Sequence, residues 1–205
     1  MIQNEIRYIS LGDSYTSGEG VQQEETYPSL LTSHLRNKGL NIKLIANLAV
    51  SGFTTKDVLN IELPQYEKLN PTFATLLIGA NDINHSEINK DLYRQRLMKI
   101  INNMQDHLPK KNRILLLTIP NFSITPYAKI LEMGKELLQK IEEFNNIIKE
   151  IGNIKNLTVI DIFPLSKEMG TDSSLIVDDI HPSEKEYKLW EEIIFPVAWK
   201  LLKKK

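Results

Sequence analysis

Five short, strongly apolar segments are spaced along this sequence, and longer stretches with the three- and four-residue periodicity of helices lie between them. Strands that are apolar along their whole length are typical of a parallel sheet covered by helices on both faces. We therefore predict an α/β fold, a three-layer α/β/α sandwich around a five-stranded parallel sheet. No Gly/Ser-rich linker or internal repeat interrupts the pattern, so we expect a single domain over residues 1–205. The apolar segments cover residues 6–11, 42–46, 73–78, 114–119 and 157–162.

The expected helices have recognisable ends. Pro64 should close the second one, because proline lacks the N–H that a helix interior needs. Gly152 should end the helix over 131–151, since glycine is favoured just past a helix C-terminus. Ser183 and Glu186 have the spacing of a capping box for the last helix. The expected helices cover residues 27–38, 54–64, 93–108, 131–151 and 183–201.

Composition excludes several classes of protein. The 25 Lys and Arg residues are balanced by 26 Asp and Glu residues, so nothing indicates a nucleic-acid partner. The chain has no cysteine, which excludes disulfides, thiolate zinc sites and a thiol nucleophile. No apolar run reaches the ~20 residues that span a bilayer, so we expect no stable membrane insertion. Residues 1–7 do not resemble a signal peptide, and we expect a cytoplasmic protein unless a leader preceded Met1.

Polar residues follow four of the predicted strands. Gly-Asp-Ser stands at 12–14 after the first strand, and 47–52 follow the second. Gly-Ala-Asn-Asp stands at 79–82 after the third, and Asp-Asp-Ile-His-Pro stands at 178–182 beyond the fifth. Ligands of an open parallel sheet bind beyond the carboxyl ends of its strands. The sequence therefore predicts that these side chains meet at one edge of the sheet.

These residue types suit nucleophilic catalysis. A serine hydroxyl becomes a nucleophile when a base takes its proton and a third group orients that base. Ser14 is the candidate nucleophile, His181 the base, and Asp178 the carboxylate that can curl back to the imidazole Nδ1. The oxyanion of an acyl transition state needs preformed donors. The backbone N–H of Gly52, the side-chain amide of Asn81 and the N–H of Ser14 are the candidates.

The same blocks resemble those of a known family. Residues 12–18, Gly-Asp-Ser-Tyr-Thr-Ser-Gly, resemble the first block of the GDSL/SGNH hydrolases. Gly52 within 50–52 resembles the second block, 79–82 the third, and Asp178-x-x-His181-Pro182 the last. The stretch 118–128 is similar to the bacterial subgroup of lysophospholipase-like esterases. The resemblance runs from about residue 6 to 190, and all four blocks occur in the family's order.

The resemblance implies a flavodoxin-like fold, an SGNH-hydrolase-type domain and ester hydrolysis through a serine acyl-enzyme, with no cofactor or metal. It assigns Ser14 as nucleophile, Gly52 and Asn81 as oxyanion donors, His181 as base and Asp178 as its partner. Asp179 stands where the family often has glycine, so two neighbouring carboxylates could orient the imidazole.

The substrate is expected to be a small-molecule or lipid ester. The loop over 121–128 should follow the fourth strand and lie beside the nucleophile. It offers Phe122, Ile124 and Tyr127 as an apolar wall for the acyl group. Such a wall suits a short acyl chain at least as well as a long one, and the expected substrates are a short-chain ester, a lysophospholipid or an acetylated sugar.

Two other functions fit parts of the pattern. A metal-dependent phosphoesterase could use Asp13, Asp82, Asp178, Asp179 and His181 as ligands. It would lack a second histidine on the same edge unless His85 bent inwards. A non-catalytic binding module could use the same scaffold, although it would have no need for the serine, histidine and carboxylate together.

Residues beside the blocks have less reactive interpretations. Asp13 and Asp82 are expected to hydrogen-bond loop backbone and to hold Ser14 and Asn81 in place. Trp190 is expected to pack in the core rather than to contact substrate.

Overall fold

A computed structural model describes residues 5–203 and contains one parallel sheet. Its five strands lie in the order β2-β1-β3-β4-β5. This is the flavodoxin-like order, and it confirms the predicted α/β fold. The central pairs are in register at Tyr8 with Phe73 and at Ala74 with Ile114. The strands are β1 (Ile6–Gly12), β2 (Ile42–Asn47), β3 (Phe73–Leu77), β4 (Ile114–Leu117) and β5 (Thr158–Ile160).

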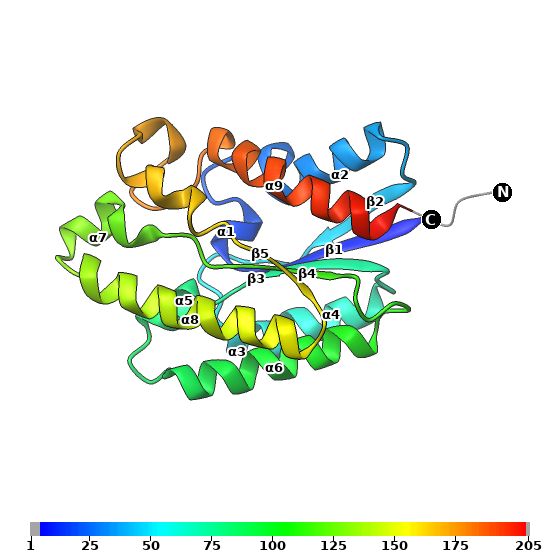
Figure 1. The fold of residues 1–205 in the computed structure, drawn as a ribbon, viewed down its shortest axis with the longest axis horizontal. Coiled ribbons are helices and arrows are strands. Elements are labelled where there is room, and N and C mark those ends of the chain that lie inside the picture. The colour runs from blue at the N-terminus through cyan, green and yellow to red at the C-terminus, as the bar shows by residue number, and fades with distance from the viewer. Residues whose placement is uncertain (1–4, 204–205) are drawn as a thin grey trace.

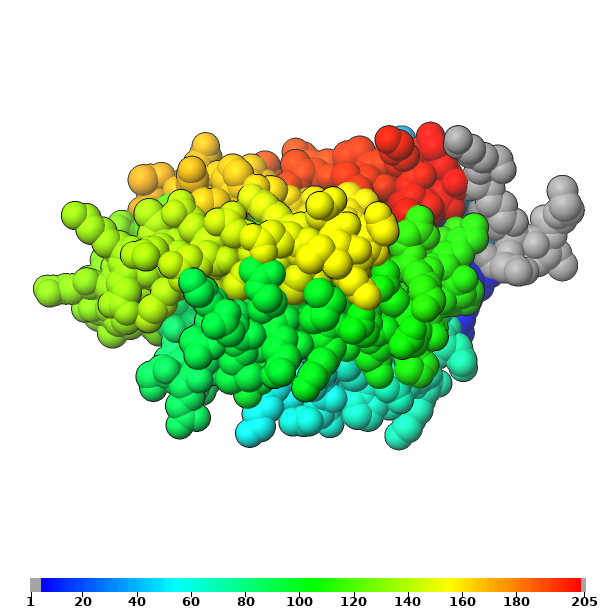
Figure 2. All heavy atoms as spheres, turned by 60° about the horizontal axis from the view of Figure 1, so that its bottom comes forward, coloured from blue at the N-terminus to red at the C-terminus, as the bar shows by residue number. Residues whose placement is uncertain are grey.

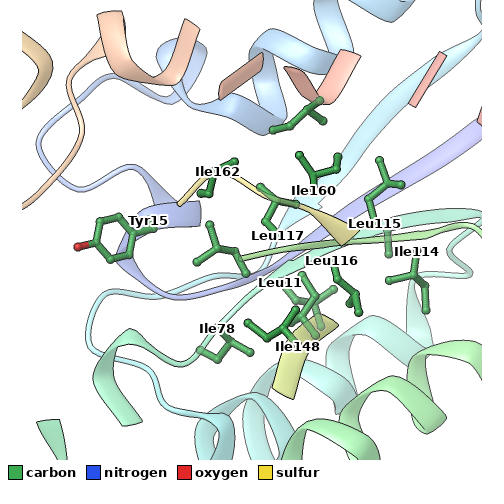
Figure 3. Close-up of a cluster of buried hydrophobic side chains, with 14 of the residues drawn as sticks. Leu11, Tyr15, Ile78, Ile114, Leu115, Leu116, Leu117, Ile148, Ile160 and Ile162 are labelled. Atoms are coloured by element: carbon green, nitrogen blue, oxygen red, sulfur yellow. The ribbon is translucent and has the colours of Figure 1, made fainter. Parts of the chain in front are cut away.

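The central strands are apolar on both faces because both faces are covered. Every residue of β3 and of β4 is buried. Figure 3 shows Ile160 and Ile162 on one side of the sheet and Ile78 and Ile148 on the other. The predicted sandwich therefore has a core on each side of the sheet.

Helices form the two outer layers (Figure 1). One layer contains α2 (Tyr27–Asn37) and α9 (Glu184–Leu202), which pack against each other. The other contains α4 (Leu63–Lys68), α6 (Lys90–Asp106) and α8 (Gly134–Ile154). Figure 2 shows α8 lying along α6 over the outer surface of this second layer. Within residues 5–203, no helix is long and apolar enough to cross a membrane.

Short helices lie at the end of the sheet where the strands finish. They are α1 (Ser14–Ser17), α3 (Thr55–Asp57), α5 (Ala80–Asn84) and α7 (Pro126–Ile130). Short 3-10 turns accompany them at 23–25, 122–124, 165–170 and 173–175. Because they follow the carboxyl ends of the strands, these short elements carry part of the candidate site, including Ser14 and Asn81, and the loops beside them carry the rest.

The prediction that Pro64 closes the second helix is wrong. Residues 58–62 form a π-helical segment between α3 and α4, and the helix continues to Lys68. The π turn is wider than an α turn, and the N–H of Leu63 donates to the carbonyl of Val58. Pro64 therefore stands in the first turn of a new α-helical segment, where a missing N–H is tolerated.

Two further helix ends differ from the prediction. Gly152 lies inside α8, which ends at Ile154, and Asn156 supplies the left-handed residue with a φ of 53°. Gly152 is required for packing instead, since a Cβ there would lie 2.3 Å from Val159 Cγ2. Ser183 caps α9 by accepting from the N–H of Glu186, but the Glu186 carboxylate accepts from Trp190 Nε1 rather than reaching back.

Candidate active site

The first strand ends in a sharp turn that presents Ser14. Gly12 has a φ of +152°, and a Cβ there would lie 2.2 Å from the Leu77 carbonyl oxygen, so only glycine fits. Asp13 caps α1 by accepting from the N–H of Tyr15 at 3.1 Å. Ser14 is the first residue of α1 and is 7% exposed. The turn therefore places the serine at the sheet edge, with its N–H at a helix N-terminus.

A short loop before α9 holds the histidine and its carboxylate. The Nδ1 atom of His181 lies 2.8 Å from Asp178 Oδ2. Asp178 Oδ1 also accepts from the N–H groups of Ile180 and His181, at 2.8 and 2.7 Å. Partial burial alone would raise the pKa of Asp178, but these hydrogen bonds outweigh it and hold the pKa below its usual value. The carboxylate therefore stays charged and orients the ring.

The structure distinguishes the two neighbouring aspartates. The imidazole hydrogen bond belongs to Asp178, which uses both carboxylate oxygens within its own turn. Asp179 is exposed, and its carbonyl accepts from the N–H of Tyr127 at 3.0 Å. Asp179 thus connects the loop to α7.

Asn81 and Gly52 line one cavity together with Ser14. Gly79 is the residue before α5 and has a φ of +131°; only glycine fits there, because a Cβ would lie 2.8 Å from the Tyr93 ring. Asn81 donates one amide N–H to the carbonyl of Phe53 at 2.9 Å, which leaves its second amide N–H available. Gly52 has a φ of +83°, and a Cβ there would meet no atom within 4 Å. A substrate carbonyl therefore has room beside Gly52.

The cavity brings most of the predicted site together. It has a volume of about 230 Å³ and is lined by Ser14, Gly52, Asn81 and His181. The predicted acyl-wall residues Phe122 and Tyr127 also line it. Ile124 does not, because it faces the loop at Gly170, where an added Cβ would lie 2.9 Å from the Ile124 Cβ.

Other lining residues were not predicted. Asn84 lies three positions after Asn81 on the same short helix, and this spacing is the signal that could have found it. Tyr15 follows the nucleophile, and its ring centroid lies 5.9 Å from that of His181. The remaining unpredicted lining residues are Ser51, Ala80 and Ile180.

Two buried carboxyl groups support the turns. Asp82 accepts from the N–H of Thr55 at 2.8 Å and from the Thr55 hydroxyl, which joins α5 to α3. Burial raises the pKa of Asp82 and raises that of Asp13 to about 7, where the nearby charge of Asp82 acts in the same direction. Both side chains are inaccessible to solvent. They are consequently placed to hold Ser14 and Asn81.

The part of the chain that the structure describes contains no group of three His, Asp or Glu side chains arranged to hold a metal ion. Asp13 and Asp82 are buried and bonded as above, while Asp178 is bonded to His181. The donor set of the phosphoesterase alternative is therefore dispersed.

The flavodoxin-like sheet and the hydroxyl, imidazole and amide groups at its edge are typical of a class of ester-hydrolysing α/β enzymes. Residues 10–189 match the model of the GDSL-like lipase/acylhydrolase family, and the chain belongs to that family.

Individual relatives are distant in sequence. A multidomain esterase of Ruminococcus flavefaciens is 25% identical over an alignment of 195 residues. The match covers 77% of this chain and 24% of that protein. The chain thus spans about a quarter of the length of this curated relative.

Two solved structures share the fold over nearly their whole length. The lipase/acylhydrolase from Enterococcus faecalis has a TM-score of 0.75 and 25% identity, covering 97% of this chain and 98% of that one. Axe2, an acetylxylan esterase from Geobacillus stearothermophilus, has a TM-score of 0.76 and 17% identity, covering 94% and 93%.

Proposed function

We propose that this protein is a metal-independent serine hydrolase that cleaves carboxylic esters through an acyl-enzyme. One observation carries the proposal. The His181 imidazole lies 2.8 Å from the Asp178 carboxylate, and it lines the same cavity as Ser14. This combination supplies a nucleophile, a base and a group that orients the base.

In the proposed mechanism, Ser14 Oγ attacks the ester carbonyl while His181 Nε2 takes the hydroxyl proton. Asp178 holds Nδ1 and stabilises the imidazolium that forms. His181 then gives its proton to the departing alcohol oxygen, and an ester of Ser14 remains. A water molecule, deprotonated by His181, attacks this acyl-enzyme and releases the acid.

The tetrahedral intermediates place negative charge on the former carbonyl oxygen. We assign its donors as the N–H groups of Gly52 and Ser14 and the second amide N–H of Asn81. The hydrogen bond from Asn81 to Phe53 fixes the amide before substrate arrives. Donors that are fixed in advance need no reorganisation during the reaction, which is the main source of their effect.

The cavity supports a short acyl group. Its volume of about 230 Å³ is below the roughly 300–1,000 Å³ of pockets that enclose drug-sized ligands. Phe122 and Tyr127 supply an aromatic wall. We therefore place acetyl and other short-chain esters, acetylated sugars among them, ahead of lysophospholipids.

A panel of p-nitrophenyl esters of increasing chain length, run beside an acetylated sugar and a lysophospholipid, tests the proposal. We expect kcat/KM to be highest for the acetyl or butyryl ester and to be unchanged by EDTA. A fluorophosphonate probe should label Ser14. EDTA-sensitive hydrolysis of p-nitrophenyl phosphate, in place of the carboxylic esters, would favour a metal-dependent phosphoesterase, and absence of both hydrolysis and labelling would favour a binding module.

A further inference from the structure

A glutamate lies buried directly behind the nucleophile turn. Glu62 is the last residue of the π-helical segment at 58–62, and its side chain is inaccessible to solvent. Its Oε2 atom accepts from the N–H of Gly12 at 3.0 Å. Gly12 ends β1 two residues before Ser14, so this hydrogen bond holds the start of the turn from inside the protein.

The surroundings of Glu62 disfavour a negative charge. The ionisable groups that interact electrostatically with Glu62 are Asp13, Asp57 and Tyr27. None of these is a cation that would stabilise a negative charge on Glu62. Burial, more than these neighbours, raises the pKa of Glu62 to about 9. Glu62 is consequently a neutral acid at pH 7, and its carboxyl group can accept from Gly12 without placing a second charge beside Asp13.

Two carboxyl oxygens remain unpaired next to this hydrogen bond. Glu62 Oε1 and Asp13 Oδ2 are both buried, and neither has a hydrogen-bond partner within the described residues. An ionised Glu62 would add a buried charge with a single donor to a site that already holds the Asp13 carboxyl group. Such a charge is costly unless it is paired, so burial favours the neutral form of Glu62.

We propose that Glu62 is a positioning residue for the nucleophile, whose buried carboxyl group accepts from Gly12 and fixes the Gly12–Ser14 turn so that the hydroxyl and N–H of Ser14 face the cavity. This inference rests on the proposed function for its effect on rate. Ionisation of Glu62 would place negative charge behind the point where the oxyanion develops. This charge would slow acylation without a direct contact between Glu62 and substrate.

Glu62→Gln and Glu62→Ala separate this role from simple packing. Glutamine keeps an oxygen that accepts from Gly12 and cannot ionise, whereas alanine removes the acceptor. With p-nitrophenyl acetate at pH 7, we expect Glu62→Ala to lower kcat by about 10- to 100-fold with KM within about 2-fold, and Glu62→Gln to retain at least about a third of kcat.

The pH profile gives the sharper test. The parent should lose kcat as pH rises through about 9, where Glu62 ionises, and Glu62→Gln should lack this fall. Glu186→Gln is the matched control, because Glu186 is also buried but bonds to Trp190 on α9. It should keep the parent profile. An unchanged alkaline fall in Glu62→Gln, or a parent-like kcat in Glu62→Ala, would overturn the proposal.

A readout independent of ester hydrolysis separates the two proposals. The amide resonance of Gly12 should titrate near pH 9 in the parent and in Ser14→Ala, and should not titrate there in Glu62→Gln. A Gly12 amide that does not respond to pH removes Glu62 from this role even if the enzyme hydrolyses esters. A titrating amide in a protein that cleaves no ester would instead contradict the proposed function alone.

Discussion

The two halves of the candidate site are built in opposite ways. On the nucleophile side, Asp13, Glu62 and Asp82 are inaccessible to solvent, and the hydrogen bonds of Glu62 and Asp82 connect segments far apart in the chain. On the base side, the Asp178 and His181 side chains are 45% and 17% exposed, and their hydrogen bonds stay within one turn. The position of the nucleophile thus depends on the whole fold, and that of the base on local geometry.

This difference predicts which substitutions lower the catalytic rate alone and which also lower the stability of the fold. Removing an acceptor from a buried donor costs about 1–3 kcal/mol, because the donor is left without water or a partner. An exposed ion pair contributes only about 0–1 kcal/mol. Changes on the base side should therefore lower activity at nearly constant stability, and changes behind the nucleophile should lower both.

The largest effect should come from Ser14→Ala. We expect kcat to fall by about 10⁴-fold or more and fluorophosphonate labelling to disappear, because no other group can form the acyl-enzyme. The Tm should stay within about 2 °C of the parent, since the hydroxyl faces the cavity. Mass spectrometry of the labelled protein measures the first effect. Labelling that persisted in the variant would reject Ser14 as nucleophile.

Asp178→Asn should follow, with a loss of roughly 10³- to 10⁴-fold in kcat, because an amide favours the wrong tautomer of His181. Asp179→Asn is the matched control and should stay within about 3-fold of the parent. Circular dichroism melts should show little change for either variant. If Asp179→Asn were the inactive one, the orienting carboxylate would be displaced by one residue.

Asn81→Ala should have an intermediate effect. Loss of one oxyanion donor costs roughly 2.7–4 kcal/mol of transition-state stabilisation, about 10²- to 10³-fold in kcat, with KM little changed. Steady-state kinetics with p-nitrophenyl acetate measure both constants. A variant that raised KM alone would make Asn81 a residue for ground-state binding.

The smallest effects concern stability against pH. Burial raises the pKa of Asp13 and of Glu186 to about 7, and that of Glu62 to about 9. Each group is neutral in the folded protein where the unfolded chain would be ionised, so the folded state binds more protons. Their stabilising contribution is complete below the unfolded pKa of about 4 and is lost as pH rises through these values.

The free energy of unfolding should therefore fall between pH 5 and 9.5, with a decrease in Tm of roughly 10 °C. The lowered pKa of Asp178 changes stability only at pH values below this range, so Asp178 does not oppose the fall in the free energy of unfolding. Glu62→Gln should flatten the slope most between pH 7 and 9.5. Thermal melts across this range check the sign, and a Tm that rose with pH would contradict it.

The same contrast between local and distant contacts explains what the sequence could predict. Asp178 and His181 lie three positions apart, so their spacing alone indicated the contact. The five strands and the four polar blocks were also predictable, because apolar runs and turn residues are local signals, whereas the flavodoxin-like arrangement followed only from the family resemblance. Glu62 and Gly12 lie fifty positions apart, and a single glutamate in a helical stretch is typical of a solvated face.

Two features differ from what the sequence pattern predicts, and their causes are related. Ile124 lies beside Gly170 and not in the lining of the cavity, because the direction of a loop side chain depends on what packs beside it. Pro64 does not end a helix, because a π turn, which has no clear sequence signature, accommodates it. Both features depend on three-dimensional neighbours rather than on periodicity.

The hydrogen bond from the N–H of Tyr127 to the carbonyl of Asp179 has a consequence for redesign. It couples the aromatic wall of the cavity to the loop that carries the imidazole. Directed evolution of acyl-chain preference would naturally target residues 121–128, but a backbone shift there would also move the base. Libraries that vary the Phe122 and Tyr127 side chains while excluding proline at position 127 would change the shape of the cavity and preserve the link.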